Sequence, residues 1–163
     1  MDDVRIYNYA LSSKQIMNIM AGGEVTDTAV APVSAARGGP VLSMNFDEGY
    51  GTTARDASSQ GNSGTLTNMA SPATATSGWS NSGKYGKALA FDGTNDYVTK
   101  NTYSQSLDIT TLSISTWINP SVSPSSGNYG YIFTRGDPTH TSNSDKQYEL
   151  SMSSSNAIRF RSN

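Results

Sequence analysis

The chain opens with the stretch MDDVRIYNYALSSKQIMNIMAGG (residues 1–23), which combines a short strand pattern with one compact helix pattern. Val4 and Ile6 alternate with Arg5 and Tyr7, as expected for a strand that buries one face. The polar Ser-Ser pair that follows separates this strand from a segment with helical spacing. The sequence therefore predicts a strand, a short turn and a helix in the first 23 residues.

The predicted helix covers 12–21 and has sequence signals at both ends. Ser12 and Gln15 have the spacing of a capping box, in which each residue satisfies a free backbone N–H at the helix start. Gly22-Gly23 supplies the left-handed residue with which many helices end. One face of this helix is apolar, and we expect it to be buried; its residues are Ile16, Ile19 and Met20.

Composition favours an all-β fold. The chain has 163 residues, of which 35% are hydrophobic and only 15% charged, with nine Tyr, four Phe and two Trp. A net charge of −2 argues against a nucleic-acid-binding protein, which would carry a basic surface. No apolar run approaches the ~20 residues of a membrane span. Because cysteine is absent, disulfides and thiolate metal sites are excluded.

Short alternating segments follow a linker. Residues 24–40 are rich in small residues, proline and glycine, and we interpret them as an extended linker. From 41 onward, the sequence reads as short strands joined by Gly, Asn and Ser turns, which predicts an antiparallel two-sheet sandwich. The expected strand segments are VLSMNF (41–46), KALAFDGTNDYVTK (87–100), TTLSISTWINP (110–120), YGYIFTRGD (129–137), QYELSMSS (147–154) and AIRFRSN (157–163).

Several of these stretches resemble LamG-like, concanavalin-A-like jelly-roll domains of bacterial surface proteins and glycan-active enzymes. The matching stretches are LSMNFDEGYGTTARDASSQGNSGTLTN (42–68), GKALAFDGTNDYVT (86–99) and LSISTWINP (112–120). The opening DDVRIYNYALSSKQI (2–16) is similar to the closing strand and terminal helix of that family. The resemblance therefore implies an all-β jelly roll with one short helix near the N-terminus.

The order of the segments is unusual for this family, because the closing segment precedes the opening one. The resemblance implies the end of one repeat in 1–23, the linker 24–40, and a C-terminally incomplete jelly-roll domain in 41–163. Two explanations remain open: the chain is a fragment of a tandem array, or 1–23 folds back and supplies the closing strand and helix. The first 23 residues are in either case a candidate for self-association.

The sequence offers no recognisable catalytic centre, and we expect none in this chain. The acidic pair Asp47-Glu48 places neighbouring side chains on opposite faces of a strand, which does not suit a pair of glycosidase carboxylates. His140, the one histidine, lies in a loop without a nucleophile nearby in sequence, and is more often a solvated side chain than a catalytic base. Whether the parent protein is an enzyme stays open.

Aromatic residues in loops and at strand starts are the candidates for glycan binding. Sugar-binding sandwiches stack exposed aromatic rings on pyranose faces. Trp79 lies in a predicted loop, where it serves equally well as a sugar platform or as packing beneath its own loop. Tyr129 and Tyr131, in SSGNYGYIF, are candidates of the same kind.

Calcium is the cofactor that this sequence supports best, since oxygen ligands are plentiful and thiolates are absent. In related jelly-roll glucanases a structural Ca²⁺ joins the first strands to the last. The resemblance assigns its carboxylate to Asp2 and a backbone carbonyl to Gly93. The alternative, by similarity to laminin-type domains, is a rim site at Asp137 and Asp145.

The resulting hypothesis is a non-catalytic glycan-binding or adhesion module of a larger secreted or cell-surface protein. Its expected partner is a glycan or surface polysaccharide, with no nucleic acid and no membrane span. One alternative is a structural repeat or assembly unit of a surface fibre, in which residues 1–23 complete a sandwich. Another is an accessory domain of a glycoside hydrolase.

Overall fold

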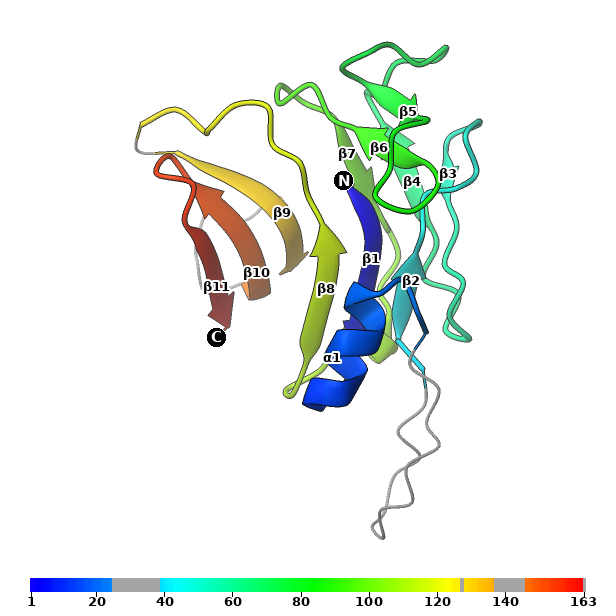
Figure 1. Cartoon of the computed structure of the whole chain (residues 1–163), viewed down its shortest axis with the longest axis vertical. Helices are drawn as coiled ribbons and strands as arrows, with labels where there is room; N and C mark the ends of the chain where they lie inside the picture. The colour runs from blue at the N-terminus through cyan, green and yellow to red at the C-terminus, as the bar shows by residue number, and fades with distance from the viewer. Residues whose placement is uncertain (25–38, 127, 137–145, 163) are drawn as a thin grey trace, which may run out of the picture. The chain divides into compact units, whose positions relative to one another are not determined.

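The computed structural model describes residues 1–24, 39–126, 128–136 and 146–162. It confirms an all-β fold with antiparallel sheets and one short α-helix (Figure 1). The chain divides into two compact units, Met1–Ile118 and Asn119–Asn163. The elements of the first unit are β1 (Asp2–Tyr7), α1 (Ser13–Met20), β2 (Leu42–Met44), β3 (Thr53–Ala54), β4 (Gly64–Thr67), β5 (Gly78–Ser80), β6 (Ala88–Ala90), β7 (Tyr97–Thr99), the 3-10 turn η1 (Gln105–Leu107) and β8 (Ser113–Trp117). The second unit contains β9 (Tyr129–Gly136), β10 (Lys146–Ser153) and β11 (Ile158–Ser162).

The first strand of the chain is the central strand of a three-stranded sheet ordered β2-β1-β8. Ile6 pairs with Leu42 on one side and with Ile114 on the other, and both partners are antiparallel. Ile6 is completely buried and Val4 is 6% exposed. Residues 1–7 therefore fold back onto segments far along the same chain and occupy the middle of the sheet (Figure 1).

A second sheet, ordered β3-β4-β7, covers the Ile6 face of the first. Gly64 of β4 marks the close approach, because a Cβ at this position would lie 2.5 Å from Val98 Cγ1 and 3.3 Å from the Met44 side chain. Met44 is on β2, so the two sheets meet across this core in a sandwich-like arrangement. The buried apolar residues of the two sheets include Val4, Ile6, Leu42, Met44, Ala54 and Leu66.

Helix α1 packs on the β1 face that carries Tyr7. The predicted capping box is confirmed. The Ser12 hydroxyl accepts from the Gln15 amide, and Gln15 Oε1 accepts from the Ser12 amide. Gly22 has φ +80°, the left-handed conformation expected at the helix end. The apolar cluster under the helix consists of Tyr7, Tyr9, Ile19 and, at its margin, Leu11.

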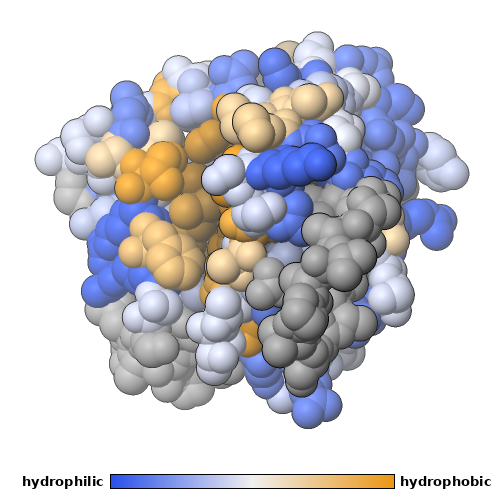
Figure 2. Space-filling view, turned by 60° about the horizontal axis from the view of Figure 1, so that its bottom comes forward, coloured by the Kyte–Doolittle hydropathy of each residue, from blue (hydrophilic) through white to orange (hydrophobic). Residues whose placement is uncertain are grey.

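The expectation that the whole apolar helix face is buried was wrong for two of its three residues. Ile19 is 3% exposed, whereas Ile16 and Met20 are 45% and 60% exposed. The eight-residue helix meets the sheet through a narrow contact centred on Ile19, which leaves its neighbours at the surface. Figure 2 shows apolar residues reaching the surface in the view that brings the lower end of Figure 1 forward.

The two strands predicted around Asp92-Gly93 exist, but they do not pair with each other. β6 pairs with β5, and β7 pairs with β4 in another sheet. Trp79, expected in a loop, lies on β5 opposite Leu89. Leu89 in turn exchanges two backbone hydrogen bonds with Met1, which links β6 to the start of β1.

The loop before β6 fastens the helix end to the sheet through Tyr85. The Tyr85 amide donates to Asp2 Oδ2 at 2.9 Å, and its hydroxyl donates to the carbonyl of Met20 at 2.7 Å. Its ring meets Trp117 of β8 edge to face, with 6.0 Å between the centroids. Tyr85 thereby joins β1 through its backbone amide, and β8 and α1 through its side chain.

The second unit is a three-stranded meander ordered β11-β10-β9. The strand pairs expected for 129–137, 147–154 and 157–163 are present as β9, β10 and β11. A register shift between Leu150 and Ser151 gives β9 one extra residue opposite β10. Phe133 and Tyr148 stack with nearly parallel rings at 5.7 Å.

Candidate functional site

One face of the sheet β9-β10-β11 combines aromatic and charged side chains. Residues directly opposite each other in neighbouring strands share a face of the sheet. One cross-strand row is Tyr131, Ser151 and Arg159, and the next is Thr134, Glu149 and Arg161. Tyr129, opposite Ser153, extends the same face. We call this set the tyrosine face: Tyr129, Tyr131, Thr134, Glu149, Ser151, Ser153, Arg159 and Arg161.

The two tyrosines of this face are accessible. Tyr129 is 43% and Tyr131 58% exposed. The guanidinium carbon of Arg159 lies 4.6 Å from the centre of the Tyr129 ring, a cation–π contact that holds both side chains. The structure thus brings together the two tyrosines that the sequence had singled out, and adds an arginine to them.

The polar floor of the tyrosine face is buried. Ser151 is completely buried and Glu149 is 3% exposed, and the Ser151 hydroxyl donates to Glu149 Oε1 at 3.0 Å. Sequence reasoning missed Glu149, Arg159 and Arg161 as site residues. Their alternation with apolar residues in ELSMS and IRFRS is a signal for a shared face, but pairing them with Tyr131 requires the strand register.

Trp79 is half-buried and tied to a neighbouring loop. Its indole Nε1 donates to the carbonyl of Gly51 at 2.8 Å. Its position on β5 is in the first unit, whereas Tyr129 and Tyr131 are in the second. The three predicted aromatic candidates therefore do not belong to one sheet.

Asp2 and Asp3 form a buried acidic pair at the start of β1. They are 3% and 4% exposed, and Asp3 has φ +51° where the register of β1 with β8 shifts. Asp2 Oδ1 and Asp3 Oδ2 are buried without a hydrogen-bond partner. The other Asp3 oxygen accepts from Arg5 Nε at 2.8 Å. Burial raises the pKa of Asp3, although the Arg5 guanidinium lowers it in part.

The second predicted calcium ligand, Gly93, lies in a turn with its own contacts. Gly93 has φ +76°, and the Asp92 carboxylate accepts from the Thr94 amide at 2.8 Å. The Asp92 amide donates to Asp96 Oδ2, while Asp96 Oδ1 is buried without a partner. The contacts of Asp2 are instead with the loop of Tyr85.

The remaining candidate ligands and the histidine lie outside the described residues. They are Asp137, Asp145 and His140. Within the described part of the chain, no three Asp, Glu, His or Cys side chains converge as a metal site would require.

The carboxylates of Asp47 and Glu48 accept hydrogen bonds from backbone amides of other segments. Asp47 Oδ1 accepts from the Lys87 amide at 2.7 Å, and Glu48 Oε1 accepts from the Arg55 amide at 2.6 Å. The strand expected for this stretch ends at Met44, and Phe46 has φ +56°. The two carboxylates are thus held apart by separate loop contacts.

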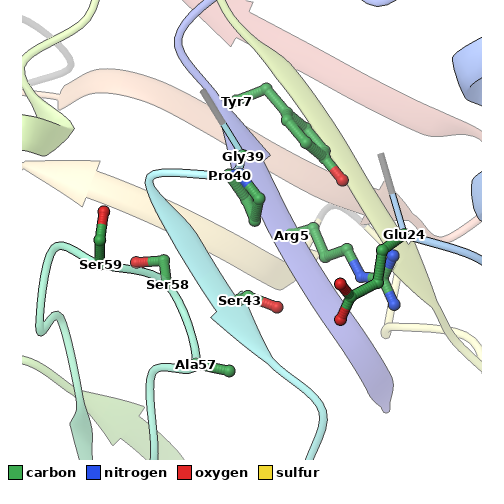
Figure 3. Close-up of a pocket in the computed structure, with 9 residues that line it drawn as sticks. All are labelled: Arg5, Tyr7, Glu24, Gly39, Pro40, Ser43, Ala57, Ser58 and Ser59. Carbon is green, nitrogen blue, oxygen red and sulfur yellow. The ribbon is translucent and has the colours of Figure 1, made fainter. Parts of the chain in front are cut away.

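A pocket of about 270 Å³ lies beside β1 and β2 on the side of Arg5 (Figure 3). Arg5 donates from one terminal nitrogen to the carbonyl of Gly23 at 2.7 Å. Three serine side chains give the lining a polar character. The residues that line the pocket are Arg5, Tyr7, Glu24, Gly39, Pro40, Ser43, Ala57, Ser58 and Ser59.

Comparisons of the chain with models of protein families, with curated proteins and with solved structures give no match. In the described residues, no helix has the length and apolar character needed to cross a bilayer.

Proposed function

We propose that this chain is a non-catalytic glycan-binding module of a larger secreted or cell-surface protein. The observation that carries the proposal is the tyrosine face, where two exposed aromatic rings lie in register with hydroxyl, carboxylate and guanidinium groups. Aromatic rings provide apolar contact for sugar faces, and a few fixed polar groups orient the hydroxyls. The LamG-like resemblance supports the same conclusion.

The arrangement of the tyrosine face suits a platform better than a catalytic cleft. Glu149 is its one carboxylate among the described residues, it is buried, and it accepts from Ser151. Hydrolysis of a glycoside needs two carboxylates across the bond. The face therefore provides binding groups and lacks an acid–base pair of its own.

A glycan array with the whole chain tests the proposal. The Tyr131→Ala variant is expected to lose about three- to tenfold in affinity for whichever glycan binds, since it removes one ring contact. Tyr50→Ala is the matched control, because Tyr50 is a 77% exposed tyrosine in the other unit. Absence of any bound glycan, or equal losses in both variants, would refute the function.

We further infer that Ca²⁺ stabilises the start of β1 through Asp2. The support is the pair of buried carboxylate oxygens, Asp2 Oδ1 and Asp3 Oδ2, that lack hydrogen-bond donors. A cation bound at Asp2 would satisfy its free oxygen and offset the cost of burying this negative charge. Carbonyls and waters would complete the six to eight oxygens that Ca²⁺ takes.

Thermal melting with Ca²⁺ and with EDTA tests this site. At a hundredfold excess over Kd, ligand linkage predicts ~2.7 kcal/mol of stabilisation for the wild type. Asp2→Asn keeps an oxygen acceptor for the Tyr85 amide but removes the charge, so the EDTA effect should disappear. An effect that survives Asp2→Asn and is lost in Asp137→Ala would move the ion to the alternative pair. No EDTA effect would exclude calcium.

A second candidate function, assembly of a surface fibre, is favoured by the central position of β1. The strand belongs to a segment separated from β2 by residues 21–41, so the same pairing with β2 and β8 is available to a neighbouring molecule. Sedimentation of the intact chain over a concentration series would show oligomers that grow with concentration. A monomer at all concentrations would leave only the binding function.

A further inference from the structure

The tyrosine face carries two arginines, and their placement indicates the chemical class of the ligand. Arg159 and Arg161 are two residues apart on β11 and therefore point to the same side of the sheet. Arg161 is exposed and Arg159 partly so. On this face the described charges are these two cations and the single buried Glu149, although the whole chain has a net charge of −2.

The position of Arg159 limits how a sugar can contact the Tyr129 ring. Its guanidinium lies over the Tyr129 ring, so this side of the ring is covered by a cation and is not open to a pyranose. The contact with the ring also restricts the movement of the guanidinium, which carries its N–H donors in a planar fork. Such a held guanidinium is suited to bidentate contact with an oxyanion.

Tyr131 provides the complementary part of the surface. It is 58% exposed and lies in the same cross-strand row as Arg159, with the buried Ser151 between them. A ligand on this row meets the Tyr131 ring and, beside the neighbouring Tyr129 of the same strand, the Arg159 guanidinium. A neutral sugar would use the ring and leave the cation unpaired.

We propose that the tyrosine face binds acidic polysaccharides, in which sugar rings carry carboxylate or sulfate groups. The ring of one sugar packs on Tyr131 while its acidic group is bound by Arg159, and Arg161 binds the next acidic group along the chain. This inference rests on the glycan-binding function proposed above and names its substrate class.

The test compares matched acidic and neutral polymers on the whole chain. Polygalacturonate is compared with its methyl ester, and dextran sulfate with dextran, by calorimetric titration. The acidic member of at least one pair should bind about tenfold or more tightly than its neutral partner, and raising the salt from about 0.05 to about 0.5 M should weaken it. The pair that responds identifies carboxylate or sulfate as the recognised group.

Variants separate the arginines from the general charge of the chain. Arg159→Gln should reduce acidic-polymer binding about tenfold and weaken neutral-polymer binding much less, while Arg159→Lys, which keeps the charge without the planar fork, should restore acidic-polymer binding only in part. Arg55→Gln, which removes an exposed arginine in the other unit, is the control and should have no effect. Circular dichroism verifies that each variant is folded.

The outcomes separate binding of acidic polysaccharides from glycan binding in general. Binding of neutral and acidic polymers with equal affinity, sensitive to Tyr131→Ala but not to Arg159→Gln, would overturn the acidic class and retain glycan binding. Equal binding of poly-glutamate would overturn it as well, because charge alone would then suffice. Failure of every polymer to bind would refute both.

Discussion

The sheets centred on β1 and on β10 are both three-stranded and antiparallel, but they are built from different distances along the chain. β1 pairs with β2 and β8, which begin at Leu42 and Ser113, whereas β10 pairs with its immediate neighbours β9 and β11. Their tyrosines have opposite environments: Tyr7 is completely buried, while Tyr131 is 58% exposed. The long-range sheet buries Tyr7, whereas the local meander buries Tyr148 but presents Tyr129 and Tyr131 to solvent.

Removal of residues 1–23 should have the largest effect, because it takes away the central strand of the first sheet. β2 and β8 would lose both their common partner and the core residue Ile6. We expect the cooperative thermal transition of the first unit to disappear, a loss comparable with the whole stability of a domain, about 5–15 kcal/mol. Circular dichroism melting measures this, and a synthetic peptide of residues 1–23 should restore the transition.

The control for this deletion is Met17→Ser, which changes a 63% exposed residue of α1 and should leave the transition in place. A truncated chain that melts like the intact one would show that β1 adds nothing to the sheet. The two sheets would then differ only in how far apart along the chain their paired strands lie.

Substitution of single isoleucines sharpens the comparison. Ile6→Ala, at the centre of the long-range sheet, should lower the free energy of unfolding by about 2–5 kcal/mol because it opens a cavity. Ile158→Ala removes the same atoms from a 55% exposed position in β11 and should cost less than about 1 kcal/mol. Urea unfolding measures both. Equal costs would contradict the assignment of β1 to the core.

The smallest effect is expected from Tyr7→Phe. The Tyr7 hydroxyl is buried and makes no hydrogen bond of ordinary geometry, so its removal should change the free energy of unfolding by less than about 1 kcal/mol near neutral pH. Burial raises the pKa of Tyr7 above its ordinary value of 10.0, although Arg5 lies near enough to lower it in part. The folded chain therefore favours the neutral phenol. Ionisation of Tyr7 leaves the free energy of unfolding unchanged below pH 10.0, and this free energy falls as the pH rises through 10.0 towards the pKa of the folded chain.

Melting temperatures measured from about pH 8 to about pH 11 test this sign. The wild type should lose more stability than Tyr7→Phe across the upper part of that range. Parallel curves for the two proteins would mean that Tyr7 ionises as easily in the folded chain as in the unfolded one.

Local signals in the sequence were sufficient for the helix and for the meander. The capping box of Ser12 and Gln15 depends on residues three apart, and β9, β10 and β11 pair in the order in which they follow one another along the chain. The all-β class follows from composition and alternation. These features need no knowledge of distant partners.

Pairings between residues that are distant along the chain could not be predicted from the sequence. The strands on either side of Asp92-Gly93 look like a hairpin, yet the structure assigns them to different sheets because each finds an earlier strand as its partner. The tyrosine face shows the same limit: Tyr131 was a candidate from its surroundings, but Arg159 joins it only through the register of β10 with both neighbours. A one-residue slip would place these side chains on opposite faces.

The central position of β1 has a consequence for the order in which the chain is made. Tyr7 leaves the ribosome before its partner Ser113, with roughly a hundred residues synthesised in between, which takes about 5–20 s at usual translation rates. During that interval the apolar residues Val4 and Ile6 have no complete sheet to enter. Newly synthesised chains should therefore depend on chaperones for the first 23 residues until β8 has emerged, while β9, β10 and β11 can pair as soon as they appear.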